Sequence, residues 1–258
     1  MTAEALMDLV RSGKLSPQSE EPPPEPLAVY GLDNVDCPVC HNTGLVTTEK
    51  DGVLYSKDCE CMATRRSLRA LKKSGLEELS KLYTFDSYKA DNPIASSLLQ
   101  YARKYVEDTP KWFLVSGRPG SGKSHICTAI CTELISRGYH VIYMLWRDES
   151  VKLKSSLASD PEYYNRRMDE LKNADVLYID DFLKGKVKDA DFNLAFELLN
   201  FRYTQPSKRT IISTELDFSS LRKIDDALAR RIYERSEGYR RRSPDKNYSY
   251  EKKTTDCN

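Results

Sequence analysis

The chain has 258 residues, enough for one full domain and a smaller appendage but too few for a long repeat array. Its 40 Lys and Arg residues balance 39 Asp and Glu residues, which leaves a formal charge of +1. This charge excludes a strong positive field over the whole protein, so any binding of nucleic acid requires locally clustered positive charge. Because 40% of the residues are apolar and no run approaches the roughly 18 apolar residues of a membrane helix, we expect a globular, cytoplasmic protein without a membrane partner.

Residues 1–36 are predicted to form a short amphipathic helix and a linker. Apolar side chains gather on or beside one face of residues 1–15, and five of the 12 prolines fall between Pro17 and Pro26. Proline among Gln, Ser and Glu favours extended chain without a core. Two interpretations of the helix stay open, a frayed terminus and a docking peptide on a tether.

Residues 37–75 are predicted to form a zinc-binding module. Cys37 and Cys40 form one close pair and Cys59 and Cys61 another, in a chain with seven cysteines and no export signal, which favours metal ligation over disulfides. Between the pairs, Gly44 and Asp51-Gly52 are typical of a hairpin that folds one pair over the other. Four thiolates suit tetrahedral Zn²⁺, which would supply the folding energy of so small a module.

Two alternatives to the four-thiolate site stay open. His41 is a possible substitute ligand, although it follows Cys40 directly and competes for the same position, and the four cysteines are otherwise free thiols. A basic helix from Ala63 to Ser74, ending at Gly75, follows the cysteines and closes the module.

Residues 76–242 are predicted to form an α/β domain. The expected strands are Trp112–Ser116, His140–Leu145, Val176–Ile179 and Thr210–Thr214. Helical segments near 125–137, 149–172 and 189–203 separate them. Such alternation indicates a parallel sheet flanked by helices. Cys127 and Cys131, four residues apart on the first of these helices, are expected to be small core residues.

A phosphate-binding motif lies between the first of these strands and the helix that follows it. Its eight residues fit the pattern G-x-x-x-x-G-K-[ST]: Gly117, Arg118, Pro119, Gly120, Ser121, Gly122, Lys123 and Ser124. Glycines let backbone N–H groups approach a triphosphate at a helix N-terminus. We expect Lys123, on an exposed loop, to reach the β and γ oxygens of ATP, and Ser124 to offer its hydroxyl to Mg²⁺.

Two carboxylates follow the buried strand Val176–Ile179. We expect Asp180 to hold Mg²⁺ through water and Asp181, which projects to the other side, to polarise the attacking water. Adjacent carboxylates at a turn are often only solvated, but their position after four apolar residues in a chain with a phosphate-binding motif favours the catalytic interpretation.

Two segments are weak candidates for contact with single-stranded DNA, because they hold the cations and aromatic rings that bind backbone and bases. One is the loop Lys184-Gly185-Lys186, and the other lies between the second and third strands with Lys152, Lys154, Tyr163, Tyr164, Arg166 and Arg167. A solvated charged face is the alternative for both.

With both nucleotide motifs in place, the chain resembles the AAA+ ATPases that load replicative helicases, the DnaC/DnaI group with its phage-encoded relatives, and the kindred IstB transposition ATPases. The resemblance covers most of residues 37–242. Besides the cysteine pairs and the phosphate-binding motif, it rests on Tyr178-Ile179-Asp180-Asp181-Phe182, Asn200-Phe201-Arg202-Tyr203, Ile211-Ile212-Ser213-Thr214-Glu215-Leu216 and Ala227-Leu228-Ala229-Arg230-Arg231-Ile232.

The resemblance implies further site residues. A sensor at the tip of the fourth strand aligns with Thr214 or Glu215, and we prefer Thr214 because a carboxylate repels the γ-phosphate. An arginine finger that acts on a neighbouring subunit matches Arg231 best, with Arg230 as the alternative. Only 27 residues follow Arg231, too few for a helical lid of the usual AAA+ kind, and residues 243–258 are expected to be a disordered polar tail.

The predicted function is that of an ATPase with ATP, Mg²⁺ and Zn²⁺ as cofactors, which assembles into a ring or spiral and loads a hexameric replicative helicase onto single-stranded DNA. Two alternatives stay open: an IstB-like ATPase that assists a transposase, and a zinc-dependent adaptor that binds ATP without hydrolysis.

Overall fold

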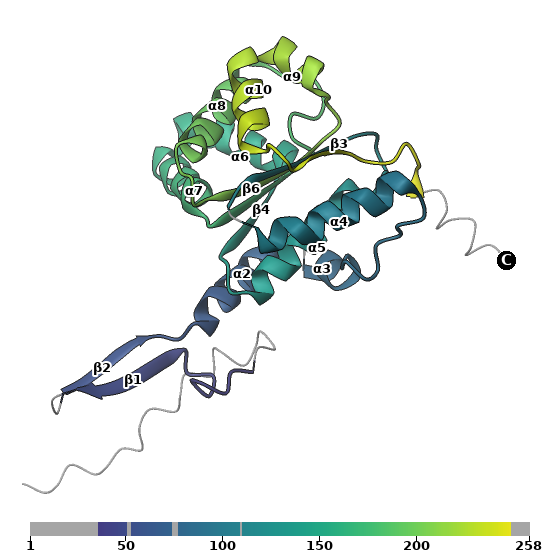
Figure 1. The fold of residues 1–258 in the computed structure, drawn as a ribbon. Coiled ribbons are helices and arrows are strands. Elements are labelled where there is room, and N and C mark those ends of the chain that lie inside the picture. The colour runs from purple at the N-terminus through teal and green to yellow at the C-terminus, as the bar shows by residue number, and fades with distance from the viewer. Residues whose placement is uncertain (1–35, 51–52, 74–76, 109, 249–258) are drawn as a thin grey trace, which may run out of the picture. The chain divides into compact units, whose positions relative to one another are not determined.

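The computed structural model describes residues 36–50, 53–73, 77–108 and 110–248. The predicted N-terminal helix and the proline-rich linker lie outside these residues. The chain divides into two compact units, with the boundary between Met62 and Ala63 (Figure 1).

The first unit is built on a β-hairpin. Strand β1 (Leu45–Lys50) pairs with β2 (Val53–Asp58) in antiparallel register, with Leu45 opposite Asp58 and Lys50 opposite Val53. The predicted hairpin between the cysteine pairs is therefore confirmed. Every residue of β2 is exposed, so the hairpin has little apolar core. Helix α2 (Cys61–Lys73) follows, with its first two residues in the first unit and the rest in the second.

The second unit contains a five-stranded sheet in which every pairing is parallel. Its strand order is β4 (Val141–Leu145), β5 (Val176–Asp180), β6 (Arg209–Thr214), β3 (Trp112–Ser116) and β7 (Arg240–Arg242). Strands β5 and β6 are buried along their whole length, as strands covered on both faces are. The predicted α/β class with a parallel sheet is confirmed.

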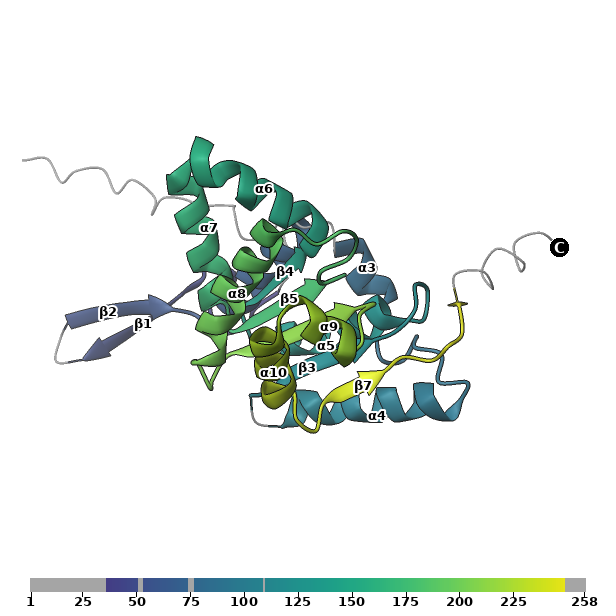
Figure 2. The same ribbon diagram turned by 90° about the horizontal axis from the view of Figure 1, so that it is seen from above.

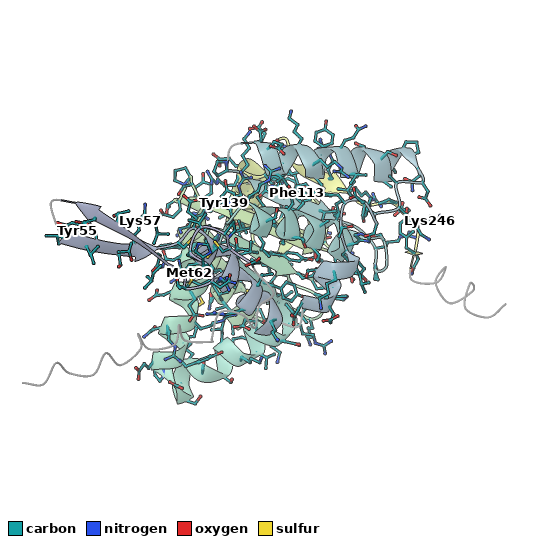
Figure 3. The ribbon with its side chains drawn as sticks, turned by 90° about the horizontal axis from the view of Figure 1, so that it is seen from below. Tyr55, Lys57, Met62, Phe113, Tyr139 and Lys246 are labelled. Carbon is teal, nitrogen blue, oxygen red and sulfur yellow. The ribbon has the colours of Figure 1, made fainter. Side chains whose placement is uncertain are left out.

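Helices cover both faces of this sheet (Figures 1 and 2). The core on one face includes residues of α4 (Pro93–Glu107) and α5 (Lys123–Ser136), and α3 (Glu77–Leu82) packs beside it. The other face is covered by α6 (Trp146–Ser159), α7 (Pro161–Asn173), α8 (Asp189–Tyr203), α9 (Phe218–Ile224) and α10 (Asp226–Arg235). Phe113, labelled in Figure 3, is fully buried in the first of these cores. Cys127 and Cys131 are also fully buried there, as predicted.

The strand order positions the candidate site. In a parallel sheet all strands end at the same edge, and ligands bind outside these carboxyl ends. Because β5, β6 and β3 are neighbours, the segments after Asp180, Thr214 and Ser116 meet at one edge of the sheet.

Two elements differ from the sequence prediction. The helix expected at 149–172 is two helices, because Pro161 disfavours a helical residue before it and lacks an N–H, and the Asp160 side chain caps α7 by accepting the Tyr163 N–H at 3.0 Å. Strand β7 was not expected, because three consecutive arginines carry no apolar signal.

The expected disorder of residues 243–258 does not hold for the part that the structure describes. Ser243 and Pro244 are buried, and the chain to Tyr248 makes hydrogen bonds to the second unit. Across the described residues, no helix is long and apolar enough to span a bilayer.

Candidate nucleotide and metal sites

The predicted phosphate-binding residues form one tight turn between β3 and α5. Gly122 caps the N-terminus of α5 with a φ of 85°, and Gly120 has a φ of 73°. Side chains on Cβ rarely tolerate this left-handed region, which explains the glycines. The Gly117 N–H donates to the Thr214 carbonyl at 3.1 Å and so fixes the start of the loop to β6. The turn leads directly into the N-terminus of a helix, the arrangement that binds anions.

Lys123 is buried, which corrects the expectation of an exposed lysine. Its side chain folds over the loop, and Nζ donates to the carbonyls of Gly117 at 2.9 Å and Arg118 at 2.8 Å. Burial lowers the pKa of the Lys123 ammonium below its ordinary value, although the carboxylates of Glu215 and Asp181 oppose this shift. A triphosphate in the loop would therefore have to replace the carbonyl partners of Nζ.

Ser124 and Asp180 meet, as the two predicted magnesium ligands should. Ser124 Oγ donates to Asp180 Oδ1 at 3.1 Å, and the Ser213 hydroxyl donates to the same oxygen. Two oxygens at neighbouring corners of an octahedral Mg²⁺ site, each about 2.1 Å from the ion, lie about 3.0 Å apart. The observed spacing therefore fits direct coordination of one magnesium ion by both oxygens, whereas the sequence predicted that Asp180 holds the ion through water.

Asp181 lies beside Asp180 but is held differently. Its φ of 52° is left-handed, and its N–H donates to the Ser213 hydroxyl at 3.0 Å. Its carboxylate forms an ion pair with Lys184 Nζ at 3.0 Å. The same ammonium lies 2.8 Å from a carboxylate oxygen of Glu215. A hydrogen bond to Glu215, followed by the one to Asp181, raises the pKa of Lys184 above its ordinary value.

The two sensor candidates have different environments. The Thr214 hydroxyl is fully buried, donates to the Phe182 carbonyl at 2.9 Å and accepts the Leu216 N–H at 3.1 Å. Glu215 is half-buried beside Lys184. Sequence reasoning assigned Lys184 only to a nucleic-acid loop, although its spacing of three residues from Asp181 was a signal for this ion pair.

Both finger candidates lie on α10. The Arg231 guanidinium lies over the rings of Phe196 at 5.0 Å and Tyr203 at 5.8 Å, and its Nη1 is buried with no hydrogen-bond partner among the described residues. Arg230 is more exposed and pairs with Asp226 at 2.6 Å. In the part of the chain that the structure describes, neither arginine contacts the phosphate-binding loop or the Asp180–Asp181 pair.

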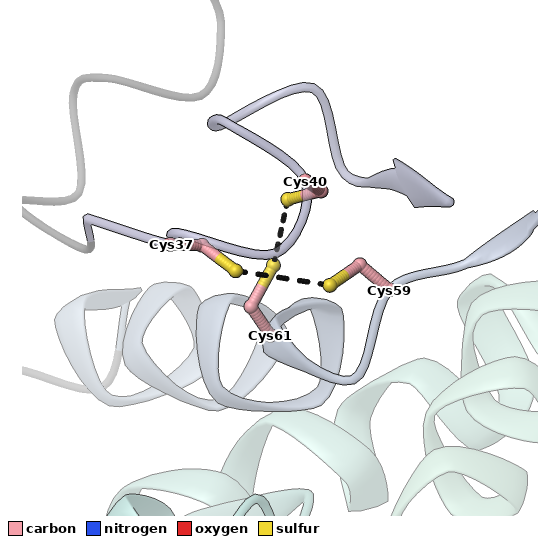
Figure 4. A group of neighbouring side chains, drawn as sticks. All are labelled: Cys37, Cys40, Cys59 and Cys61. Atoms are coloured by element: carbon pink, nitrogen blue, oxygen red, sulfur yellow. Dashed lines mark hydrogen bonds between the residues drawn. The ribbon is translucent and has the colours of Figure 1, made fainter. Parts of the chain in front are cut away.

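The four cysteines of the first unit converge (Figure 4). Their sulfur atoms all lie within 4.8 Å of one another, with 3.8 Å between Cys37 and Cys59 and 3.5 Å between Cys40 and Cys61. Four thiolates about 2.3 Å from a tetrahedral Zn²⁺ lie about 3.8 Å apart, so the cluster fits zinc. His41 is exposed and is not part of the cluster.

The backbone around the cysteines explains this convergence. His41 and Asn42 have positive φ values of 47° and 68°, which turn the chain back after Cys40. The Asn42 side chain accepts the Cys37 N–H at 3.0 Å. Desolvation raises the pKa of the Cys40 thiol, but hydrogen bonds from Gly44 and from the neighbouring thiols outweigh it and bring the pKa to about 6. A thiol of this kind is readily deprotonated for metal binding.

The structure gives different environments to the residues of the nucleic-acid candidate that lies between the second and third predicted strands. Tyr164 is buried with its hydroxyl on Glu197, Lys154 pairs with Asp191, and Arg167 pairs with Glu149 and Glu170. Lys152, Tyr163 and Arg166 line a cleft of about 730 Å³ together with Arg66 and Arg69 of α2, and Arg167 lines the same cleft.

The loop after Asp181 contributes to a second basic cleft. This cleft has a volume of about 290 Å³ and lies between α6 and the loop that leads to α8. Five cations line it, Arg147, Lys154, Lys184, Lys186 and Lys188, with Asp191 as the acid in its lining. Lys154 and Lys184–Lys186, predicted as parts of separate candidates, therefore share one cleft. Arg147 was missed, because a single arginine at the start of a helix gives no signal in the sequence.

Comparison with known sequences identifies the relatives of the chain. The family described as IstB-like ATP binding protein matches residues 42–256. The phage-like element PBSX protein XkdC of Bacillus subtilis (strain 168) is 29% identical over 92% of this chain and 91% of its own length. The replicative helicase loader DnaC of Escherichia coli (strain K12) is 31% identical over 44% of this chain and 47% of the loader, so the match spans less than half of that protein.

Solved structures share the fold. The DnaC helicase loader superposes with a TM-score of 0.54 at 23% identity over 61% of this chain and 96% of that structure. The replication initiator DnaA bound to AMPPCP and single-stranded DNA superposes with a TM-score of 0.51 at 24% identity, over 58% of this chain and 47% of that one.

Proposed function

The chain belongs to the IstB-like ATP-binding proteins, and from this premise we propose that it is an ATPase that loads a hexameric replicative helicase onto single-stranded DNA. The resemblance to DnaC-type AAA+ loaders that the sequence predicted is confirmed by the relatives and by the shared fold. The observation that carries the proposed ATPase activity is the approach of Ser124 to Asp180 within 3.1 Å beside the Lys123 loop.

We propose the following roles at the nucleotide site. Backbone N–H groups of residues 117–124, apart from Pro119, which has none, and Gly117, whose N–H is bonded to Thr214, hold the phosphates of ATP, and Lys123 exchanges its carbonyl partners for β and γ oxygens. Ser124 and Asp180 hold Mg²⁺, which neutralises charge on the phosphates when it is bound. Asp181 orients the attacking water, and Thr214 at the end of β6 senses the γ-phosphate.

The ion pair between Lys184 and Asp181 indicates that Asp181 is in an inactive arrangement in this structure. A carboxylate that an ammonium already holds is a weaker acceptor for the proton of water, so Asp181 must be released from Lys184 before it acts as proposed. The same lysine also pairs with Glu215, which reduces the repulsion that this carboxylate would otherwise exert on a γ-phosphate.

The second cation at the γ-phosphate is proposed to come from a neighbouring copy of the chain. Arg231 makes no contact with the loop in the described part of its own chain, so its proposed action is across an interface in a ring or spiral. Zinc in the Cys37, Cys40, Cys59 and Cys61 cluster is proposed to fold the first unit, whose hairpin has little core.

Single-stranded DNA is the proposed nucleic-acid partner. The cleft between α6 and the loop after Asp181 has five cations against one acid, the charge pattern that attracts a sugar–phosphate backbone. No acid lies within ion-pair distance of Arg147, Lys186 or Lys188 in the described residues, so these three cations remain available for phosphates.

Affinity capture tests the partner. The full chain, immobilised with ATP, is expected to retain a hexameric replicative helicase from a bacterial lysate, and Lys123→Ala is expected to lose this retention. Because the family is described as IstB-like, a transposase is the second candidate partner. Retention of a transposase instead of a helicase would replace the proposed function.

Phosphate release from the assembled protein separates an ATPase from an adaptor that binds ATP without hydrolysis. Asp181→Asn keeps the shape of the side chain but removes the carboxylate, so nucleotide binding should persist while release falls at least 100-fold. Glu170→Gln, a carboxylate change on α7, is the control. Equal release from Asp181→Asn and the wild type would remove Asp181 from the site.

A further inference from the structure

The chain after β7 runs over the phosphate-binding loop. Strand β7 lies parallel to β3, with Arg242 opposite Ser116, and this pairing carries the next residues to the edge of the sheet where the loop begins. We call residues Ser243–Tyr248 the strap; Lys246, labelled in Figure 3, lies near its end.

The strap makes two hydrogen bonds to the loop and one to the last residue of β3, and Asp245 of the strap lies 3.8 Å from Arg118 of the loop as an ion pair. The Ser243 N–H donates to the Ser116 carbonyl at 2.8 Å, and the hydroxyls of Ser243 and Ser121 share a hydrogen bond of 2.6 Å. The Tyr248 N–H donates to the Gly120 carbonyl at 2.9 Å. A Cβ at Gly120 would strike the Asn247 side chain, so strap and loop approach closely. The three hydrogen bonds reach carbonyl and hydroxyl oxygens of β3 and the loop.

Asp91 anchors the far end of the strap. Its carboxylate pairs with Lys246 Nζ at 2.5 Å and accepts the Tyr248 hydroxyl at 2.7 Å. The same hydroxyl accepts a hydrogen bond from the Asn92 amide at 3.1 Å, and Asn92 also caps α4. Hydrogen bonds from Lys246 and Tyr248 lower the pKa of Asp91 to about 2, so the anchor is charged at neutral pH.

We propose that the strap positions the phosphate-binding loop for nucleotide, with Asp91 and Tyr248 as positioning residues. This inference rests on the proposed nucleotide site. Lys123 and Ser121 bond the carbonyls of Gly117 and Arg118, but Gly117, Gly120 and Gly122 have no side chains of their own to fix the rest of the loop, whose N–H groups must face the phosphates. The Tyr248 N–H on the Gly120 carbonyl and the hydrogen bond between the Ser243 and Ser121 hydroxyls hold the loop without using its N–H groups. A loop held in advance binds its ligand with less ordering cost.

Nucleotide affinity tests the strap. Asp91→Asn removes one ion pair and weakens one hydroxyl bond, so the Kd of the full chain for a fluorescent, non-hydrolysable ATP analogue should rise roughly fivefold to tenfold. The KM for ATP should rise by the same factor, while kcat at saturating ATP falls less than twofold. Asp91→Glu should restore most of the affinity. Glu107→Gln is the matched control, because it removes a carboxylate that pairs with Arg137 at the other end of α4.

A second variant keeps the test independent of Asp91. Tyr248→Phe loses only the hydroxyl and should weaken the affinity for the ATP analogue two- to fivefold. In the double variant with Asp91→Asn, the loss of affinity should be smaller than the two single effects combined, because Asp91 and Tyr248 share a hydrogen bond. An unchanged or lower Kd in both variants would overturn the strap proposal while leaving the nucleotide site in place. Failure of the wild type to bind the analogue would overturn the proposed function as well.

Discussion

At the residue scale, Lys184 explains why a glutamate follows the candidate sensor. From sequence alone Glu215 was expected to repel a γ-phosphate, but the Lys184 ammonium pairs with both Glu215 and Asp181 and offsets one of their two negative charges. The contact depends on the left-handed turn at Asp181, a backbone feature that residue types at this position do not specify.

Lys123→Ala is expected to abolish nucleotide-dependent activity, because Nζ is the group that reaches the β and γ oxygens. Its two bonds to loop carbonyls are lost as well, so we expect a stability cost of about 1 kcal/mol and a Tm lower by about 2–4 °C. Phosphate release and thermal unfolding measure the two effects. Lys104→Ala, at an exposed position of α4, is the control, and unchanged hydrolysis in Lys123→Ala would refute the site assignment.

At the element scale, the sequence predicted the strands that apolar residues specify and missed the elements that depend on contacts between distant parts of the chain. Strands β3, β5 and β6 are short apolar runs buried on both faces, and their pattern placed them within one or two residues. Strand β7 and the strap have polar sequences, and their order comes from pairing with β3 and from Asp91, about 150 residues earlier in the chain. The intrinsic strand propensity of a segment does not depend on partners so distant in the chain, so it cannot predict them.

The same distinction applies to the candidate site. The glycine spacing identifies the phosphate-binding loop, and two adjacent aspartates after a buried strand identify the carboxylates. Both could be found because phosphate binding and metal binding require these residue types at fixed positions along the chain. The burial of Lys123, the shared cleft of Lys154 and Lys186, and the ion pair of Lys184 arise only when separate segments fold together.

The first unit should depend on zinc. Cys59→Ser removes one of four ligands, so we expect loss of the one zinc ion per chain. Unfolding should be confined to the first unit, up to Met62, because structural zinc contributes on the order of 10 kcal/mol in small zinc-binding folds. Metal analysis and hydrogen exchange measure both. Cys131→Ala, a buried cysteine outside the cluster, should retain zinc. Absence of zinc from the freshly purified wild-type protein would refute the proposed zinc site.

At the scale of the whole molecule, the proposed ATPase site is incomplete within one chain. The loop, Asp180 and Asp181 are proposed to supply a lysine, a metal site and a water-orienting carboxylate, while Arg231 lies on α10 over Phe196 and Tyr203. Hydrolysis is therefore expected to require assembly.

Mixed variants test this requirement. Arg231→Ala should bind ATP normally but hydrolyse it about 1,000-fold more slowly, the typical effect of a lost arginine finger. Mixing Arg231→Ala with Lys123→Ala should restore some phosphate release, because some interfaces then pair an intact loop with an intact arginine. Arg230→Ala is the control. If the two variants co-assemble but the mixture stays inactive, Arg231 is not the arginine finger and Arg230 becomes the next candidate.

ATP-dependent loading onto a closed circle of single-stranded DNA tests the central proposal most directly. A hexameric ring can enclose such a circle only if it is opened, so retention of the captured helicase on the circle after a high-salt wash measures loading. We predict retention with the wild-type chain and ATP, and little with Lys123→Ala or without nucleotide. Equal retention of the helicase under all three conditions would contradict the account.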